Sequence, residues 1–403
     1  MTRFLRAKGI DAEMFLDDSS PGGQNYPWWE HASLSPDNLP EWIHYRRVSE
    51  RDYLLKSQAF RKLSSEFARG DIALLTAWGP ILASAAGIPH VFYSYGGDLM
   101  AAHTRRELTE GVRRVIGGKR PGIRPTLLGM RQRKALQEST DVVAIMMGWQ
   151  IENYVRPLGL IGKMARTRLP WRVDDYEANP VAELVRKYDS FDVVFFMLTR
   201  HSWRSLWSDL KGNDKFIRAF AAFVHQRPGN FKLICIDKGP DVEASRQLIS
   251  RLGIERYVEW IPEMNKDGMR AYYSLPNGVV VDQFWHDEWY RRYPADEGYP
   301  RIGFGSGSIE ALCARRPLIT VFFDREFYDG AEPPILKAFT VPEIHARLRE
   351  AVDMGPERRR ELGERGHAFV RRYHDWSVVT DRYIALLEET MRKRGRRPQK
   401  AIA

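Results

Sequence analysis

The chain has 403 residues, which is enough for two domains of ordinary size. Hydrophobic residues make up 43% of it and charged residues 28%, a globular composition that excludes an intrinsically disordered protein. The net charge of +10 is local: the segment from Arg105 to Lys134 sums to +8 and the tail from Arg392 to Lys400 to +6, which leaves −4 for the rest. This distribution argues against a protein that is basic all over, such as a general nucleic-acid coat.

The start of the chain predicts a helix at 2–8 and a strand at 12–15. A Rossmann domain normally opens with a strand and a glycine-rich turn, and neither is recognisable here. Either the start lies upstream or the domain lacks its first strand. The first residues also lack the apolar core of a signal peptide. The most apolar stretch, 72–95, is interrupted by glycine and proline, so it predicts no membrane span, and we expect a cytoplasmic protein.

Short β-branched or aromatic runs then alternate with helical patterns. The first half predicts a short helix at 81–86 and strands at 72–77, 90–94 and 141–147. After a break near 168–180, helices are predicted at 215–225, 242–252 and 308–314, and strands at 192–198, 232–237, 257–261, 278–282 and 318–322. Such alternation is typical of parallel sheets covered by helices. The two cysteines, Cys235 and Cys313, lie in apolar runs and predict buried thiols rather than a disulfide framework or a zinc site.

Two such halves predict an α/β fold with two Rossmann-like domains facing a central cleft. We place the N-terminal domain at 1–172 and the C-terminal domain at 185–375. A long amphipathic helix is predicted at 378–394, within a closing segment at 376–403 that returns to the N-terminal domain. Ligands in such folds bind beyond the carboxyl ends of the parallel strands.

The strongest local signal is a glycine- and serine-rich loop that opens a helix. The loop contains Gly303, Gly305, Ser306, Gly307 and Ser308. Its glycines let the backbone approach a ligand, and the free amides and dipole at the helix start favour a phosphate. Glu310, in the first turns of the helix, can accept two ribose hydroxyls. The alternative is a glycine-rich turn whose acid stabilises the helix dipole, and on the loop alone both interpretations stand.

A second cluster follows the strand predicted at 192–198. Arg200 comes directly after this strand, and Lys211 precedes Gly212 and the next helix. Basic residues at the carboxyl end of a parallel strand can grip a diphosphate, with Arg as a fork and Lys as a point charge. The alternative is a solvated surface loop, the usual place of a charge run.

Together with three further motifs, these clusters resemble the retaining glycosyltransferases of family four, which have the GT-B architecture. From about residue 70 onward, five motifs stand in the order of that family. They are Ala86-Gly-Ile-Pro-His-Val-Phe-Tyr-Ser-Tyr-Gly-Gly-Asp-Leu, Thr199-Arg200 with Lys211-Gly212, Ala271-Tyr-Tyr-Ser with Val279-Val-Val-Asp-Gln-Phe, Gly303-Phe-Gly with Glu310-Ala-Leu-Cys-Ala-Arg-Arg-Pro, and Tyr373-His-Asp-Trp-Ser. Each motif alone is weak, and five in order are fairly specific.

The resemblance implies transfer of a sugar, with retention at the anomeric carbon, from a UDP- or GDP-linked donor to a glycan, lipid-linked or small-molecule acceptor. It implies no metal and no cofactor. The N-terminal domain would be the acceptor side, and the C-terminal domain would bind the nucleotide-sugar. Residues implied in catalysis are Arg200, Lys211, Asp98 and Tyr95, and those implied in donor binding are Gly97, Gly303, Gly305, Ser306, Gly307, Ser308 and Glu310. Among them, Arg200, Lys211 and the loop amides would stabilise charge on the leaving diphosphate, and Glu310 would hold the ribose.

Two positions depart from the family pattern, both at the sugar end of the donor. Ile302 stands where the family has the first of two glutamates, the one that touches the transferred sugar. Tyr95 stands in place of the histidine of His-Gly-x-Asp, and a phenol with a pKa of about 10 is a poor acid–base group at neutral pH. These departures leave two other functions open: a weak or inactive nucleotide-sugar-binding partner protein, and a GT-B sugar-nucleotide epimerase.

An aromatic and charged insertion lies between Gln283 and Ile302. We expect Trp285 and Trp289 to contribute to the sugar or acceptor pocket through their ring faces. The alternative is a lid that packs on its own aromatic residues.

Three interpretations apply to the basic segment from Arg105 to Lys134. It docks on anionic lipid at the inner face of the membrane, it guides an anionic acceptor toward the cleft, or it is a solvated helix and loop. We predict no nucleic-acid partner, because the sequence has no groove-reading or base-stacking motif.

Overall fold

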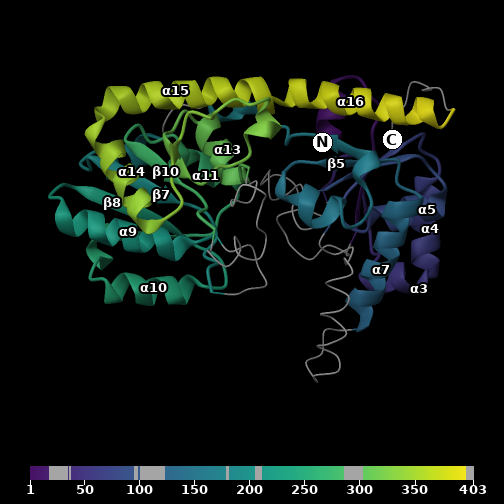
Figure 1. Ribbon diagram of the computed structural model, residues 1–403, viewed down its shortest axis with the longest axis horizontal. Coiled ribbons are helices and arrows are strands. Elements are labelled where there is room, and N and C mark those ends of the chain that lie inside the picture. The colour runs from purple at the N-terminus through teal and green to yellow at the C-terminus, as the bar shows by residue number, and fades with distance from the viewer. Residues whose placement is uncertain are drawn as a thin grey trace. The chain divides into compact units, whose positions relative to one another are not determined.

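In the computed structural model, the chain divides into two compact units. One comprises Met1–Pro170 with Trp376–Ala403, and the other comprises Trp171–Asp375. The structure describes residues 1–17, 35, 38–94, 99, 123–177, 181–204, 211–285 and 303–395. Each unit contains parallel β-strands covered by helices (Figure 1), which confirms the predicted α/β class.

The first unit is built on a four-stranded parallel sheet with the strand order β3-β4-β5-β6. Its strands are β3 (Ala73–Leu75), β4 (His90–Tyr93), β5 (Val142–Ile145) and β6 (Met164–Arg166). A separate parallel pair joins β1 (Met14–Asp17) to β2 (Ile43–Arg46). Strands β4 and β5 are buried along their whole length, as their apolar runs predict. The strands β2 and β6 were not predicted, because both are short and largely half-buried or exposed.

Helices from both ends of the chain belong to this first unit. They are α1 (Thr2–Ala7), α3 (Glu50–Leu55), α4 (Gln58–Phe67), α5 (Gly79–Ala86), α7 (Ile123–Glu138) and α16 (Trp376–Lys393), with the short turns η3 (Ile151–Val155) and η4 (Ile161–Lys163). Helix α16 is the predicted closing helix. It packs on α1, where the rings of Phe4 and Trp376 stack with their centroids 5.5 Å apart. It also meets the segment after β6, where the Tyr383 hydroxyl donates to Thr167 Oγ1 at 2.8 Å.

The second unit contains a six-stranded parallel sheet with the order β12-β11-β10-β7-β8-β9. Its strands are β7 (Val193–Met197), β8 (Phe231–Asp237), β9 (Val258–Pro262), β10 (Gly278–Val281), β11 (Leu318–Thr320) and β12 (Leu336–Lys337). If the strands of this sheet are numbered from one in chain order, starting at β7, their order across the sheet from β9 to β12 is 3-2-1-4-5-6. This is the strand order of a Rossmann fold. The strand order therefore reverses between β7 and β10, the place where such sheets bind ligands.

Aromatic side chains fill the core of the second unit. Helices of this unit are α8 (Ala182–Tyr188), α9 (Asn213–Gln226), α10 (Val242–Arg251), α11 (Lys266–Tyr273), α13 (Ser306–Cys313), α14 (Val341–Asp353) and α15 (Gly355–His374), with the 3-10 turns η5 (Val173–Tyr176), η6 (Glu255–Tyr257) and η7 (Arg325–Tyr328). Phe216, Phe220 and Phe223 follow each other on the inner side of α9 and are fully buried against Phe195 of β7. Their spacing of three and four residues is why this segment forms an amphipathic helix.

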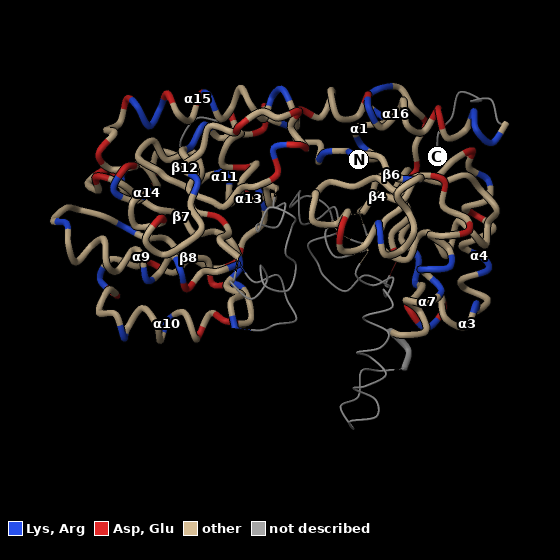
Figure 2. The backbone as a smooth tube through the Cα atoms, viewed as in Figure 1, with Lys and Arg blue, Asp and Glu red and all other residues tan. Residues whose placement is uncertain are grey.

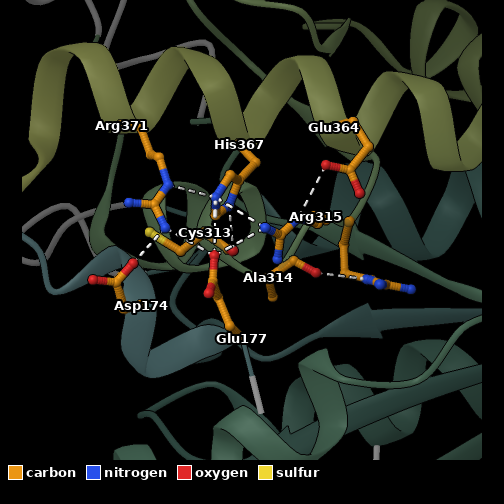
Figure 3. Close-up of polar contacts among 9 residues, drawn as sticks. Asp174, Glu177, Cys313, Ala314, Arg315, Glu364, His367 and Arg371 are labelled. Atoms are coloured by element: carbon orange, nitrogen blue, oxygen red, sulfur yellow. Dashed lines mark hydrogen bonds and ion pairs between the residues drawn. The ribbon is translucent and has the colours of Figure 1, made fainter. Parts of the chain in front are cut away.

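A cluster of ion pairs fastens the C-terminal end of α13 to α15 (Figure 3). Arg315, just after α13, pairs with Glu177 at 2.9 Å and with Glu364 of α15 at 3.0 Å. Arg371 of α15 also pairs with Glu177, at 2.8 Å, and its Nε lies 2.9 Å from Nε2 of His367. The other ring nitrogen of His367 lies 2.9 Å from the carbonyl oxygen of Cys313. Burial lowers the pKa of His367, so the neutral ring accepts from Arg371 and donates to that carbonyl.

Close packing in the same region gives a test of the α13–α15 contact. A Cβ on Gly363 would lie 2.0 Å from the backbone oxygen of Arg315, whereas one on Gly366 would meet only the side chain of Leu312, at 2.7 Å. Backbone cannot yield as a side-chain tip can, so we expect Gly363→Ala to lower the free energy of unfolding by about 2–3 kcal/mol. Gly366→Ala is the control and should cost clearly less. Equal effects in chemical denaturation would contradict this packing.

Among the described residues, no helix combines the length and the apolarity that a membrane crossing requires.

Candidate functional site

The site is assembled where the strand order of the second unit reverses. The segments that follow β7 bring residues 198–204 and 211–213 to the carboxyl ends of the strands, and the segment that follows β10 brings Asp282 and Gln283 there. The N-terminus of α13 faces the same place, because its residues contact Asp282 directly. The sequence analysis predicted Lys211 and the loop at 303–308 for this site but not Asp282 or Gln283.

Lys211 is held in place by both its backbone and its side chain. Its Nζ donates to Oε1 of Gln283 at 2.9 Å, and it lies 5.8 Å from the ring centroid of Trp285. Its carbonyl oxygen accepts from the amide of Phe284 at 2.8 Å. The next residue, Gly212, has a φ of +69°, and a Cβ there would lie 3.0 Å from the amide nitrogen of Trp285. The Lys-Gly pair is therefore fitted closely to the segment after β10.

Asp282 connects this segment to the start of α13. Its Oδ2 accepts from the Ser308 amide at 3.0 Å and from the Ser308 hydroxyl at 2.5 Å. The side chain is 5% exposed. Burial raises the pKa of the Asp282 carboxyl, while the positive charge of Lys211 and the hydrogen bonds from Ser308 act against that rise. One amide of the predicted phosphate loop thus already has an acceptor within the protein.

The glycines of this loop are needed for the same contact. A Cβ on Gly305 would lie 3.1 Å from Oδ2 of Asp282, and one on Gly307 would lie 3.3 Å from Oδ1. Gly305 is the N-cap residue of α13, so Ser306 and Gly307 occupy its first turn, where backbone amides have no partner within the helix. Gly303 lies at the start of the described part of the loop, with Asp324 beyond it: a Cβ would be 3.7 Å from Oδ2 of Asp324.

Glu310 lies on α13 in a buried environment, with only 4% of the residue exposed. The side chains of Tyr176 and Tyr273 lie near its carboxylate. Burial raises its pKa, and the charge of Lys266 opposes that rise. A carboxylate has about four acceptor sites, so this side chain has capacity for further donors. The structure therefore adds to Glu310 a packing role that the sequence analysis did not anticipate.

The turn after β7 carries Arg200, which is half-buried. The residues that follow it are fixed by backbone contacts: Asp241 accepts from the amides of Trp203 and Arg204 at 2.6 and 2.9 Å. His201 is fully buried, and burial lowers its pKa to about 3, so it is neutral at physiological pH. This part of the site carries Arg200 and Lys211, the cations that the sequence analysis proposes for the diphosphate, together with Arg204.

Several predicted site residues lie outside the described part of the chain. They are Tyr95, Gly97, Asp98, Ile302 and Trp289. Trp285 is described and is 4% exposed, with its ring near Lys211. Cys235 and Cys313 are buried free thiols, as predicted. Within the ranges that the structure describes, no group of three or more His, Cys, Asp or Glu side chains is arranged to hold a metal ion.

Neither a protein-family model nor a curated protein sequence matches this chain. Solved structures do match it. Sucrose-phosphate synthase from Thermosynechococcus elongatus aligns with a TM-score of 0.61 at 13% identity, over 97% of this chain and 92% of that protein. HepE from Anabaena, solved in complex with UDP-glucose, aligns with a TM-score of 0.63 at 13% identity, over 94% and 99%. WaaG, a glycosyltransferase involved in lipopolysaccharide biosynthesis, aligns with a TM-score of 0.59 at 12% identity, over 93% and 99%. The chain therefore has the GT-B fold with two Rossmann-like units.

Proposed function

We propose that this protein is a glycosyltransferase that moves a sugar from a nucleotide-sugar to an acceptor. The observation that carries the proposal is the position of Lys211 beside Gln283 and the N-terminus of α13, at the reversal of strand order in the second unit. The GT-B fold and the ligands named with its structural neighbours, UDP and UDP-glucose, support a nucleotide-sugar as the donor. The base, UDP or GDP, and the sugar stay open.

The chemistry follows from where negative charge develops. When the bond between the sugar and the diphosphate breaks, the leaving diphosphate gains charge, and cations fixed beside it stabilise the transition state. Lys211 supplies a point charge and Arg200 a fork with several donors. The first-turn amides of Ser306 and Gly307 add the positive end of the α13 dipole. The steps of this scheme require neither a metal nor a cofactor.

The finer assignments belong to the same proposal. Retention at the anomeric carbon, membership of family four, and roles for Tyr95, Gly97 and Asp98 near the reacting sugar rest on the resemblance in sequence. So does ribose binding by Glu310. The acceptor is a glycan, a lipid-linked sugar or a small molecule, and a cytoplasmic protein that binds peripherally to the inner face of the membrane fits the basic segment from Arg105 to Lys134.

The proposal is tested by turnover on a panel of UDP- and GDP-sugars, each with and without candidate acceptors. We expect nucleoside diphosphate to be released with one donor and the sugar to appear on an acceptor. Arg200→Ala should lower kcat/KM by about tenfold to a hundredfold, because a charged hydrogen bond contributes about 1.5–3 kcal/mol. A donor that binds tightly without turnover would instead favour the weak or inactive partner protein, which Ile302 and Tyr95 suggest.

The same assay distinguishes the remaining alternative, a sugar-nucleotide epimerase. Epimerisation or hydrolysis of the nucleotide-sugar that needs no acceptor would favour a GT-B epimerase over a transferase. If no nucleotide-sugar binds at all, the assignment of the donor site is wrong.

A further inference from the structure

Three large apolar side chains are exposed on two adjoining helices of the first unit. Leu55 at the end of α3 is 62% exposed, and Leu127 and Met130 of α7 are 43% and 48% exposed. The two helices contact each other, and Arg131 of α7 donates to the carbonyl oxygen of Tyr53 in α3 at 3.1 Å. Single exposed apolar residues are ordinary, but a group on adjoining helices marks an interaction surface.

The apolar residues of α7 are separate from its core contacts. Leu128 and Ala135 pack in the core with Tyr53 and Phe60. Leu127, Met130 and Lys134 follow each other at spacings of three and four residues, so they share another side of the helix. We call the surface formed by Leu55, Lys56, Leu127, Met130 and Lys134 the α3/α7 face.

Positive charge borders this face. Arg51 stands four residues before Leu55 on α3, and Arg51, Lys56 and Lys134 are all exposed. The acids of the same helices are engaged locally: Glu50 accepts from Trp78 at 3.2 Å, Asp52 accepts from Ser49, and Glu138 lies 3.9 Å from Lys134. Lysine and arginine recur along α3, α4 and α7 (Figure 2). In sequence, α7 completes the segment from Arg105 to Lys134, whose net charge is +8.

We propose that the α3/α7 face docks on an anionic lipid bilayer. Peripheral binding to such a bilayer needs apolar side chains that enter the boundary between headgroups and acyl chains, and cations at the level of the phosphates. Leu55, Leu127 and Met130 meet the first requirement, and the bordering cations meet the second. The proposal deepens the function proposed above by placing the enzyme where a lipid-linked acceptor resides. Lipid binding is measured without turnover, so failure of either proposal leaves the other intact.

The test is flotation of the full chain with vesicles of phosphatidylcholine alone and with roughly one quarter phosphatidylglycerol. We expect flotation at low salt only with the anionic vesicles, and loss of it at high salt. Leu127→Glu with Met130→Glu should reduce the partition coefficient by about tenfold or more. Ile161→Glu with Val378→Glu is the matched control, because these side chains are also exposed on the first unit, at 41% and 52%, but lie in η4 and α16. Thermal melting and UDP binding verify that both variants are folded.

Two results would overturn the proposal. The first is no flotation of the unaltered chain with anionic vesicles. The second is an equal loss for the two double variants. If the first result comes with a change of oligomeric state on light scattering for Leu127→Glu with Met130→Glu, the face is instead an interface between copies of this chain.

Discussion

Asp282→Ala is expected to lower the free energy of unfolding by about 2–3 kcal/mol and to weaken binding of the donor nucleotide about tenfold. The carboxylate makes two hydrogen bonds to Ser308, and each bond to a charged group contributes about 1.5–3 kcal/mol. Removing a buried carboxylate recovers part of that loss, because burying a charge is unfavourable. Binding weakens because the segment after β10 and the first turn of α13 no longer share a fixed position.

Asp282→Asn separates the positioning role of this side chain from its charge. The amide oxygen can still accept from Ser308, so the fold of the loop should be kept. Because a negative charge next to Lys211 is removed, UDP or GDP should bind as tightly as before or more tightly. Calorimetric titration and chemical denaturation measure both effects. If the alanine and asparagine variants agree in stability and in affinity, Asp282 does not position this site.

Glu310→Ala is expected to lower the free energy of unfolding by about 1–3 kcal/mol, because it removes a buried side chain that packs beside two buried tyrosines, Tyr176 and Tyr273, while the loss of a buried charge offsets part of the cost. Glu310→Gln keeps one carbonyl acceptor and should be less destabilising. Tyr176→Phe with Tyr273→Phe is the converse control, since it removes the neighbouring hydroxyls and keeps the carboxylate.

A second comparison, between the binding of a nucleotide and of pyrophosphate, tests whether Glu310 binds the ribose of the donor. If its carboxylate accepts ribose hydroxyls, Glu310→Gln should weaken UDP or GDP binding by about tenfold to a hundredfold and leave the affinity for inorganic pyrophosphate unchanged. An equal loss for both ligands would mean that the residue acts only by holding α13 in place.

Sequence patterns predicted most of the buried strands and some of the amphipathic helices, because their signal is local, whereas α4, α11, α14 and α15 were not predicted. The runs at 192–198 and 232–237 became β7 and β8, and the helical pattern at 215–225 became α9. The short strands β2 and β6 were not predicted, because three or four residues are too few to show the alternation of apolar and polar side chains that marks a strand. The strand order of the second unit also depends on packing between distant segments, which no local pattern contains.

The candidate site was predictable from the sequence only where its residues form a local motif. Lys211 and the glycine loop at 303–308 stand out as motifs, whereas Asp282 and Gln283 look like the polar end of any buried strand. Only the fold brings Asp282 within 3.0 Å of the Ser308 amide and Gln283 within 2.9 Å of Lys211. One signal was available: two polar residues directly after the buried strand at 278–281, and 20 residues or more before a glycine-rich loop, mark a strand end at which ligands bind.

The most direct test of the donor site is a calorimetric titration of UDP and of GDP into the full chain and its Lys211→Met variant. Methionine keeps an unbranched apolar stem and removes only the charge. Lys232→Met is the control: this lysine lies near the amino end of β8, away from the carboxyl ends of the strands, and its loss changes the net charge equally. The account predicts that one of the nucleotides binds, that Lys211→Met weakens it about tenfold to a hundredfold, and that Lys232→Met does not. Absence of binding by both nucleotides, or equal weakening by the two variants, would contradict it.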